Sequence, residues 1–303
     1  MKKIKTYIVL LLCAILLSCT EYVGNNVLQE SEPKVIENLT SYNDSLMLSS
    51  KKTRVSTRRL LYYLSVASAD AGGAYNGGQA GLKVGALIGQ PHIGAAIGAV
   101  CCGGYASYMC HRLLSDANVT RGVSTPNLNL KAMDIAAAYA PVLSEEKVIE
   151  KNRTDNIYLN DVSVDIKDIG AKHNLLLSNL QTNHFEKKSV KENLTSEELC
   201  ILNSDEFEIK MDSTVNQLQM SVQDGKIVQI SGNDIPAKVM NLFFEIFTNY
   251  PNDENDVGMV VSRYLKEIDL DASFSELDRI LIRQALSVAV SSFEYWSNYD
   301  KNN

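Results

Sequence analysis

The chain has 303 residues, of which 45% are hydrophobic and 21% are charged, and its formal net charge is −7. This hydrophobic content suits a folded core, and the length allows one large domain or two small ones. The acidic balance argues against binding nucleic acid through bulk charge, but it leaves enzymes and binding modules open.

The N-terminus carries the first recognisable signal, a basic MKKIK stretch followed by the apolar run YIVLLLCAILL. A basic start and a short apolar run are typical of a secretory signal, and the run is too short for a membrane-spanning helix. Residues 16–19, LLSC, resemble the lipobox of bacterial lipoproteins, in which the cysteine is lipidated and becomes the mature N-terminus. The resemblance implies a signal peptide over residues 1–18, lipidation at Cys19 and attachment to a lipid bilayer through the acylated N-terminus.

The residues after the lipobox indicate where the protein resides. Removal of residues 1–18 takes away three lysines and changes the net charge from −7 to −10. By resemblance, an aspartate directly after the cysteine retains some lipoproteins in the inner membrane, whereas this chain has Thr20 there. We therefore expect a lipid-anchored protein of the cell envelope, in the outer membrane. Residues 19–54 are polar with isolated apolar residues, which predicts a lipidated N-terminus and a flexible tether.

A row of glycines marks the next segment. Four-residue spacing places them on one face of a helix, where the missing side chains let a second helix approach closely. We therefore expect a helical hairpin over residues 55–115, with Pro91 in its connection. The glycines assigned to helix packing are Gly73, Gly77, Gly81, Gly85 and Gly89 on the first arm, and Gly94 and Gly98 on the second.

This segment resembles the glycine zippers of small bacterial envelope proteins and of membrane-inserting peptides such as class II bacteriocins. Two interpretations follow. In the first, the hairpin packs inside a lipid-tethered body, or assembles with a second copy or a protein partner. In the second, it inserts into a bilayer, because the uncharged arm over residues 93–110 is about long enough to cross one. Asp70 and Lys83 make the first arm a poor lipid-facing span, so the packed hairpin is favoured.

The rest of the chain is expected to be helical. Residues 116–155 form a connecting segment with one short helix, and residues 156–303 an all-α C-terminal domain whose apolar residues follow helical spacing. Ser273 and Glu276 have the spacing of a capping box opening the last helix. Only residues 225–232 could form a short strand. The predicted fold class is all-α, a glycine-rich helical hairpin followed by a helical-bundle body.

Catalytic and metal-binding patterns are weak. Cys101, Cys102, Cys110 and His111 lack the paired short spacings of a structural zinc site. The sequence leaves open whether these cysteines or Cys200 form disulfides. We therefore expect no metal, no cofactor and no nucleic-acid partner.

His173 lies on an apolar helical stripe with Asp168 off its face, which predicts a core histidine rather than a catalytic base. The leading hypothesis is therefore a non-enzymatic structural or binding module. A membrane-active or pore-forming protein is the alternative, and an enzyme with an unrecognised site is the third possibility.

Overall fold

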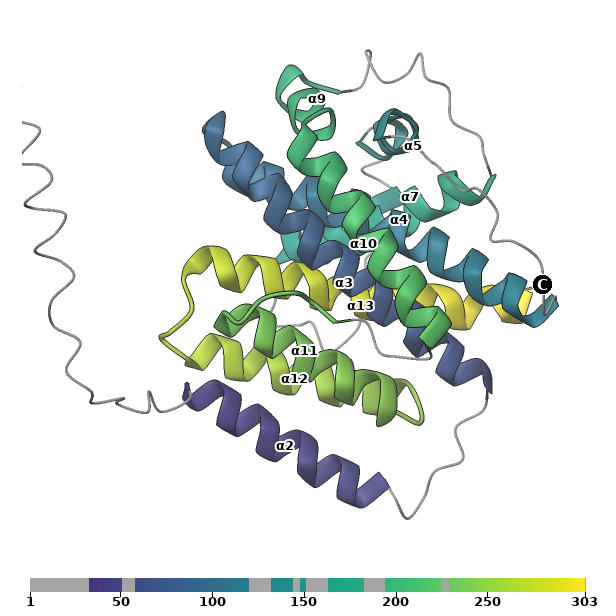
Figure 1. Cartoon of the computed structure of the whole chain (residues 1–303), viewed down its shortest axis with the longest axis vertical. Helices are drawn as coiled ribbons and strands as arrows, with labels where there is room; N and C mark the ends of the chain where they lie inside the picture. Colours follow the sequence, from purple (N-terminus) through teal and green to yellow (C-terminus); the bar gives the residue numbers. More distant parts are fainter. Residues whose placement is uncertain are drawn as a thin grey trace, which may run out of the picture. The chain divides into compact units, whose positions relative to one another are not determined.

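The computed structural model describes residues 33–50, 58–119, 132–143, 148–150, 163–182, 194–224 and 229–302. These residues belong to one compact unit that begins at Pro33. Within these ranges the protein is all-α and no strand is present, in agreement with the predicted fold class (Figure 1). The predicted signal peptide, Cys19, and residues 20–32 and 51–54 of the expected tether lie outside the described residues.

The predicted hairpin is formed by α3 (Arg58–Leu87) and α4 (Pro91–Val119), which pack against each other more extensively than any other pair of helices. Gly89 in the connection has φ +76°, a conformation in which a side chain would be strained. Pro91 is the first residue of α4, where its missing N–H has no intrahelical partner to lose. The second arm continues beyond the expected end at Cys110, so α4 is longer than predicted.

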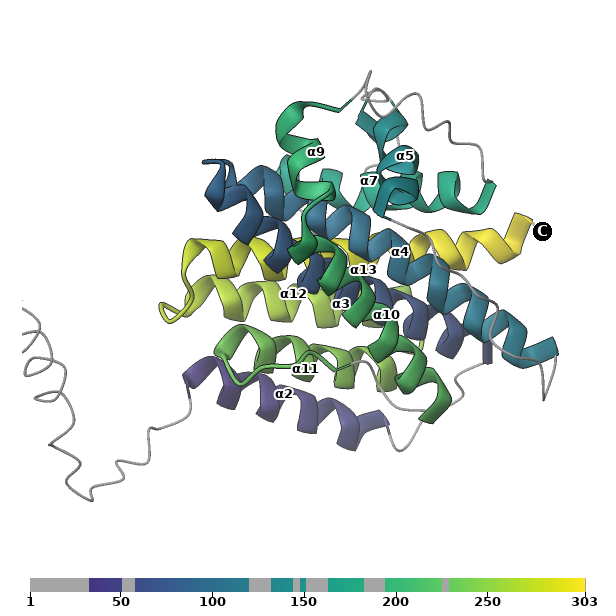
Figure 2. The ribbon, with the colours of Figure 1, turned by 45° about the horizontal axis from the view of Figure 1, so that its top comes forward.

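The hairpin is the centre of the bundle rather than a separate arm. Helix α13 (Glu276–Asn302) runs along α3, and α7 (Val164–Thr182) packs against both α4 and α13. Helices α9 (Ser196–Leu202) and α10 (Asp205–Asp224) contact both arms, and α5 (Ala132–Leu143) packs on α7, as Figure 2 also shows. The hairpin and the helices after residue 155 therefore share one core, and the predicted division at residue 155 is not a boundary between compact units.

A second group of helices contains α2 (Lys34–Ser50), α11 (Ile235–Asn249) and α12 (Glu254–Leu270). Helix α2 corrects the expectation of a flexible tether over residues 34–50. Its residues Val35, Ile36 and Leu39 are buried, and Asn43 donates a hydrogen bond to the Tyr264 hydroxyl at 3.0 Å. Tyr42, Leu46 and Met47 continue this face and pack against the core, so the apolar residues of α2 follow helical spacing along the whole helix, a signal that the expectation of a tether missed.

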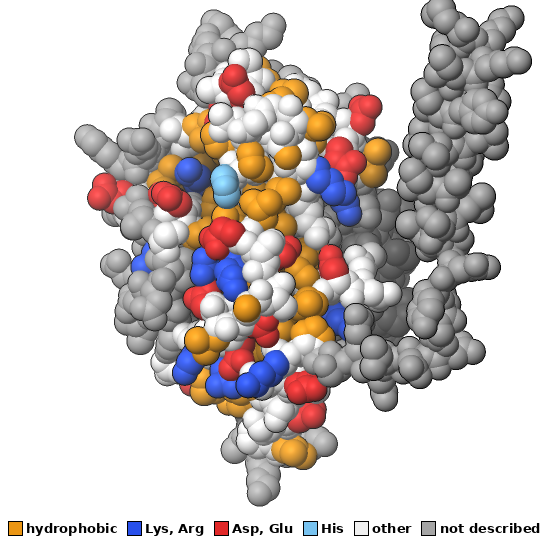
Figure 3. Space-filling model, turned by 90° about the vertical axis from the view of Figure 1, so that its left-hand side faces the viewer, with side chains coloured by type: hydrophobic (Ala, Val, Ile, Leu, Met, Phe, Trp, Pro, Cys, Tyr) orange, Lys and Arg blue, Asp and Glu red, His pale blue; other side chains and the backbone are white. Residues whose placement is uncertain are grey.

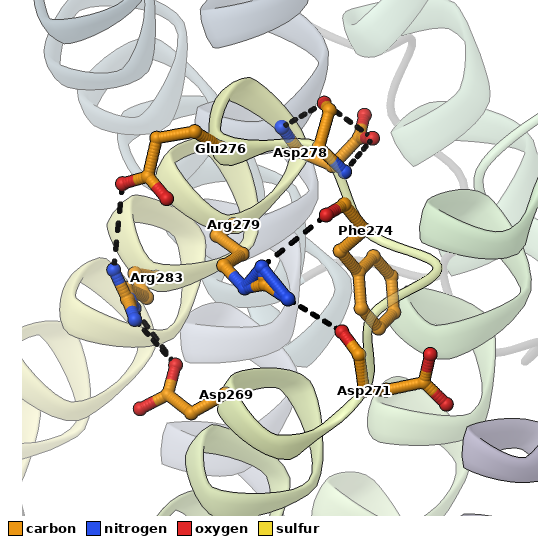
Figure 4. A network of polar contacts seen from close by, with 8 residues as sticks. Asp269, Asp271, Phe274, Glu276, Asp278, Arg279 and Arg283 are labelled. Atoms are coloured by element: carbon orange, nitrogen blue, oxygen red, sulfur yellow. Dashed lines mark hydrogen bonds and ion pairs between the residues drawn. The ribbon is translucent and has the colours of Figure 1, made fainter.

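The turn between α12 and α13 contains the capping box of the last helix (Figure 4). Ser275 and Asp278 form it, because the Ser275 hydroxyl accepts from the Asp278 amide at 3.1 Å and the Asp278 carboxylate accepts from the Ser275 amide at 3.1 Å. The predicted pair, Ser273 and Glu276, is therefore displaced by two residues. Both pairs have the three-residue spacing of a capping box, so the spacing does not distinguish them. The backbone geometry of the turn determines which pair forms the hydrogen bonds.

The same turn holds the beginning of α2. Arg279 donates to the backbone carbonyl oxygens of Phe274, at 3.2 Å, and Asp271 (Figure 4). The Asp271 carboxylate then accepts a hydrogen bond from the Val35 amide at 3.1 Å. Partial burial raises the pKa of Asp271, but hydrogen bonds from Ser273 and Val35, together with the charge of Arg279, outweigh this effect and hold the pKa below its usual value. Asp271 thereby satisfies a backbone donor in the first turn of α2.

One described helical segment, Pro91–Leu114 in α4, has the length and composition that would allow it to cross a membrane. Most of this segment is buried inside the bundle. Core helices of folded domains share these properties, so length and composition alone do not assign α4 to a bilayer.

Candidate functional site

The predicted glycine row brings the two backbones of the hairpin into direct contact. Gly77 faces Gly98, and Gly81 faces Gly94. In each pair, a Cβ atom added to either glycine would overlap the carbonyl oxygen of the other. Because the obstacle is backbone rather than a movable side chain, neither position can hold a larger residue unless α3 and α4 separate.

The remaining predicted glycines extend this contact, with one exception. A Cβ on Gly73 would lie 2.6 Å from the Cys102 carbonyl oxygen, and one on Gly85 would overlap the carbonyl oxygen of Gln90. Gly89 has no atom within 4 Å of an added Cβ, and its role is the positive φ of the turn. Gly89 therefore fits the four-residue spacing, but glycine is needed there for the turn and not for close helix packing.

Other glycines pack the hairpin against the surrounding helices, and the sequence analysis missed them. A Cβ on Gly78 would lie 2.9 Å from the Leu281 side chain of α13, and one on Gly104 would lie 2.8 Å from Leu176 of α7. These glycines fall outside the four-residue row. A helix with glycine on several faces is expected to have several close neighbours. The glycines outside the row therefore could have predicted close packing against other helices.

A buried polar cluster lies where α3, α4, α7 and α13 meet. The side chains of Asp70 and His173 are fully buried, with 3.5 Å between Asp70 Oδ2 and His173 Nε2. The Ser292 hydroxyl donates to Asp70 Oδ2, and Ser107 is also hydrogen-bonded to the Asp70 carboxyl group. Trp296 Nε1 donates to the Ser107 hydroxyl at 3.2 Å, so the cluster reaches the aromatic core.

Burial controls the protonation of this cluster. Desolvation raises the pKa of Asp70 well above its ordinary value, although hydrogen bonds from Ser292 and Ser107 act in the opposite direction. Desolvation also lowers the pKa of His173 from 6.5 to about 4, against the raising effect of hydrogen bonds with Asn174 and the Gly103 backbone. Both shifts favour uncharged side chains, as expected for ionisable groups removed from water.

His173 is oriented by its neighbour on α7. Its Nδ1 atom is hydrogen-bonded to Asn174 Oδ1 at 2.9 Å, and the Asn174 amide donates to the Ser291 carbonyl oxygen of α13 at 2.9 Å. The prediction of a core histidine is confirmed. Its acidic neighbour is Asp70 rather than Asp168. The sequence contained one signal for Asp70, an isolated acid in an otherwise uncharged part of the first arm.

The cluster holds the residue types of a serine hydrolase but not the geometry. A nucleophilic serine needs a hydrogen bond to the imidazole that takes its proton. Here the Ser292 hydroxyl donates to the Asp70 carboxyl group instead. Ser292, Asp70 and His173 are all fully buried, so a substrate cannot reach them in this conformation. The arrangement cross-links four helices through polar contacts inside an apolar core.

The cysteines of the hairpin are buried thiols. Cys101, Cys102 and Cys110 are free and buried, whereas Cys200 is free and exposed. Desolvation raises the pKa of Cys102 to about 12 and raises those of Cys101 and Cys110, so all three remain protonated at neutral pH. In the part of the chain that the structure describes, no three His, Cys, Asp or Glu side chains are grouped so that they could hold a metal ion.

Comparison of this chain with protein-family models, with curated proteins and with solved structures finds no match.

Proposed function

We propose that the protein is a lipoprotein of the cell envelope, anchored through Cys19 to the outer membrane, whose helical body is a structural or binding module rather than an enzyme. The observation that carries this proposal is the LLSC stretch at residues 16–19, preceded by a basic and apolar leader and followed by Thr20. The folded body begins at Pro33, which leaves a short connection between the lipid and the first helix.

The body supports a non-catalytic role through the placement of its polar groups. The buried polar cluster around Asp70 and His173 is sealed in the core and joins helices to one another. Catalytic groups instead need access to substrate and a cavity with converging polar atoms. The glycine faces of the hairpin are also used internally, since Gly77 and Gly81 contact Gly98 and Gly94. This argues against an assembly in which these same faces bind the hairpin of a second copy.

A membrane-active or pore-forming function is the second candidate, favoured by the apolar composition of the Pro91–Leu114 segment. Insertion would require α3 and α4 to leave the bundle. It would separate Asp70 from Ser292 and Ser107 from Trp296, and place the Asp70 carboxyl group in lipid. The packed core therefore supports the module over the pore.

The test of this proposal is Cys19→Ala, with Cys200→Ala as the matched control because it also removes one cysteine but leaves the lipobox intact. We expect Cys19→Ala to move the protein from the membrane fraction to the soluble fraction, or to accumulate as an unprocessed precursor. Mass spectrometry of the N-terminal peptide should find the diacylglycerol in the control and not in Cys19→Ala. Lipid at another residue, or an unlipidated wild-type chain, would refute the anchor. Leakage of vesicles caused by the Cys19→Ala protein would favour the pore instead.

A further inference from the structure

The tip of the hairpin is an exposed apolar element. Residues 84–93, VGALIGQPHI, contain no Asp, Glu, Lys or Arg. The Leu87 side chain is 87% exposed, Ile93 is 44% exposed, and Ile88 is partly exposed. Among the large apolar residues that are mainly exposed in the described ranges, Leu87 and Ile93 are the two closest to each other in the sequence. We call residues 84–93 the hairpin tip.

The hairpin tip extends beyond the helices that flank it. Asp70 contacts Ser292 and Gly78 faces Leu281, so α3 and α13 are antiparallel and α13 begins near the level of Lys83. Helix α10 also begins there, because Lys83 Nζ lies 3.3 Å from Glu206 Oε1. From Lys83 to the turn at Gly89, a rise of 1.5 Å per residue carries the hairpin about 9 Å further.

The first helix of the body, α2, begins on the same side of the molecule as the hairpin tip. Val35 in the first turn of α2 is hydrogen-bonded to Asp271, which lies in the turn that leads into α13. Figures 1 and 2 both show these features on the left-hand side, with the hairpin tip at the top, the start of α2 at the bottom and the α12–α13 turn between them. Figure 3, which faces this end, shows hydrophobic side chains reaching the surface between charged ones.

The length of the connection restricts where this end can be. From Cys19 to Pro33 the chain advances fourteen residues, which span at most about 50 Å when fully extended. An acyl group on Cys19 would therefore hold Pro33 within about 50 Å of the bilayer, which leaves the hairpin tip able to reach it. Such tethering raises the effective concentration of lipid around the tip far above that of any dissolved partner.

We propose that the hairpin tip inserts Leu87 and Ile93 into the interfacial region of the bilayer that holds Cys19, as a second and shallow contact that orients the body. This inference rests on the lipid anchor of the proposed function. The uncharged tip can enter the interface without burying a charge, while the Lys83–Glu206 ion pair lies behind it, next to water. The hairpin stays folded, and only its end touches lipid.

The experiment uses tryptophan fluorescence of the full-length lipidated protein in vesicles of phosphatidylethanolamine and phosphatidylglycerol with brominated acyl chains. The test variant is Leu87→Trp. The control is Leu48→Trp, because Leu48 is 67% exposed and lies near the far end of α2. The native Trp296 is buried and supplies the same background in both proteins. We expect the added fluorescence of Leu87→Trp to shift to shorter wavelength and to be quenched by bromine, and that of Leu48→Trp to remain accessible to aqueous acrylamide.

Several results would overturn the inference. One is a tryptophan at position 87 that stays accessible to acrylamide on the anchored protein. Another is equal bromine quenching of both variants. A third is a shift of the Leu87→Trp fluorescence to shorter wavelength without vesicles, which would indicate contact between protein copies. Mass spectrometry of Cys19 in the same samples separates the two proposals. Quenching of Leu87→Trp on an unlipidated chain supports the tip and removes the anchor. A lipidated Cys19 without quenching retains the anchor and removes the tip.

Discussion

Replacement of Gly81 by leucine tests the close contact at the centre of the fold. A Cβ atom at this position would overlap the Gly94 carbonyl oxygen and lie 2.7 Å from the Gly94 carbonyl carbon. These atoms belong to the backbone of α4, so the clash can be relieved only by moving a helix that also packs against α7, α10 and α13. Leucine adds three further carbon atoms at the same place.

The magnitude follows from two opposing effects. Removing glycine from a helix interior stabilises the helix by about 1 kcal/mol, whereas overpacking a core typically costs about 1–3 kcal/mol. Because the obstacle is backbone on a helix packed on several sides, we place the net loss near 2 kcal/mol. For domains of this size that loss lowers Tm by roughly 4–8 °C.

Thermal unfolding followed by circular dichroism measures this effect. Ala86→Leu is the matched control, because Ala86 lies on the same helix but is exposed, and its Tm should change little. Gly81→Ala should also lower Tm, since its Cβ alone meets the Gly94 backbone. A Tm of Gly81→Leu equal to or above that of the wild type would refute the packing argument, because helix propensity would then be the larger effect.

Gly89→Ala should lower stability by about 1–2 kcal/mol through strain at positive φ and without any clash, which a comparison of chemical unfolding midpoints with wild type would detect. Burial lowers the pKa of His173 to about 4, so the stability that the neutral side chain adds is fully present above about pH 6.5 and is lost as pH falls through 4. Between pH 6.5 and pH 4 the Tm of His173→Gln should therefore fall less than the Tm of wild type. Burial raises the pKa of Asp70, so the stability that this group adds is present below the ordinary pKa of 3.8 and is lost as pH rises through the pKa of the folded state. The Tm of Asp70→Asn relative to that of wild type should therefore increase with pH. A difference in Tm that stays constant with pH would contradict this. A fragment of residues 156–303 should lack the cooperative thermal transition of the full chain, since α13 and α7 would lose the hairpin on which they pack; a sharp transition of the fragment would restore the predicted domain boundary.

The sequence alone determined the hairpin because its signals are local. Gly77 and Gly81 fall on one face at a spacing set by the helix itself, and Pro91 marks the start of the second arm through its own covalent geometry. The placement of His173 in the core followed in the same way, from its position on an apolar stripe. The all-α class followed from helical spacing in the remaining segments.

Only the tertiary structure decided which distant residues meet. Asp70 and Ser292 are brought together by the packing of α13 along α3. No pattern in the sequence near either residue predicts this contact. Helix α2 is held by α11 and α12, which cover its apolar face, whereas the polar composition of the same residues had favoured a tether. Exposure of the hairpin tip also depends on where α10 and α13 begin, since the apolar residues of the tip resemble those of the buried arm in every local property. Local spacing fixes the shape of a segment, but burial and hydrogen bonding depend on what the rest of the chain places against it.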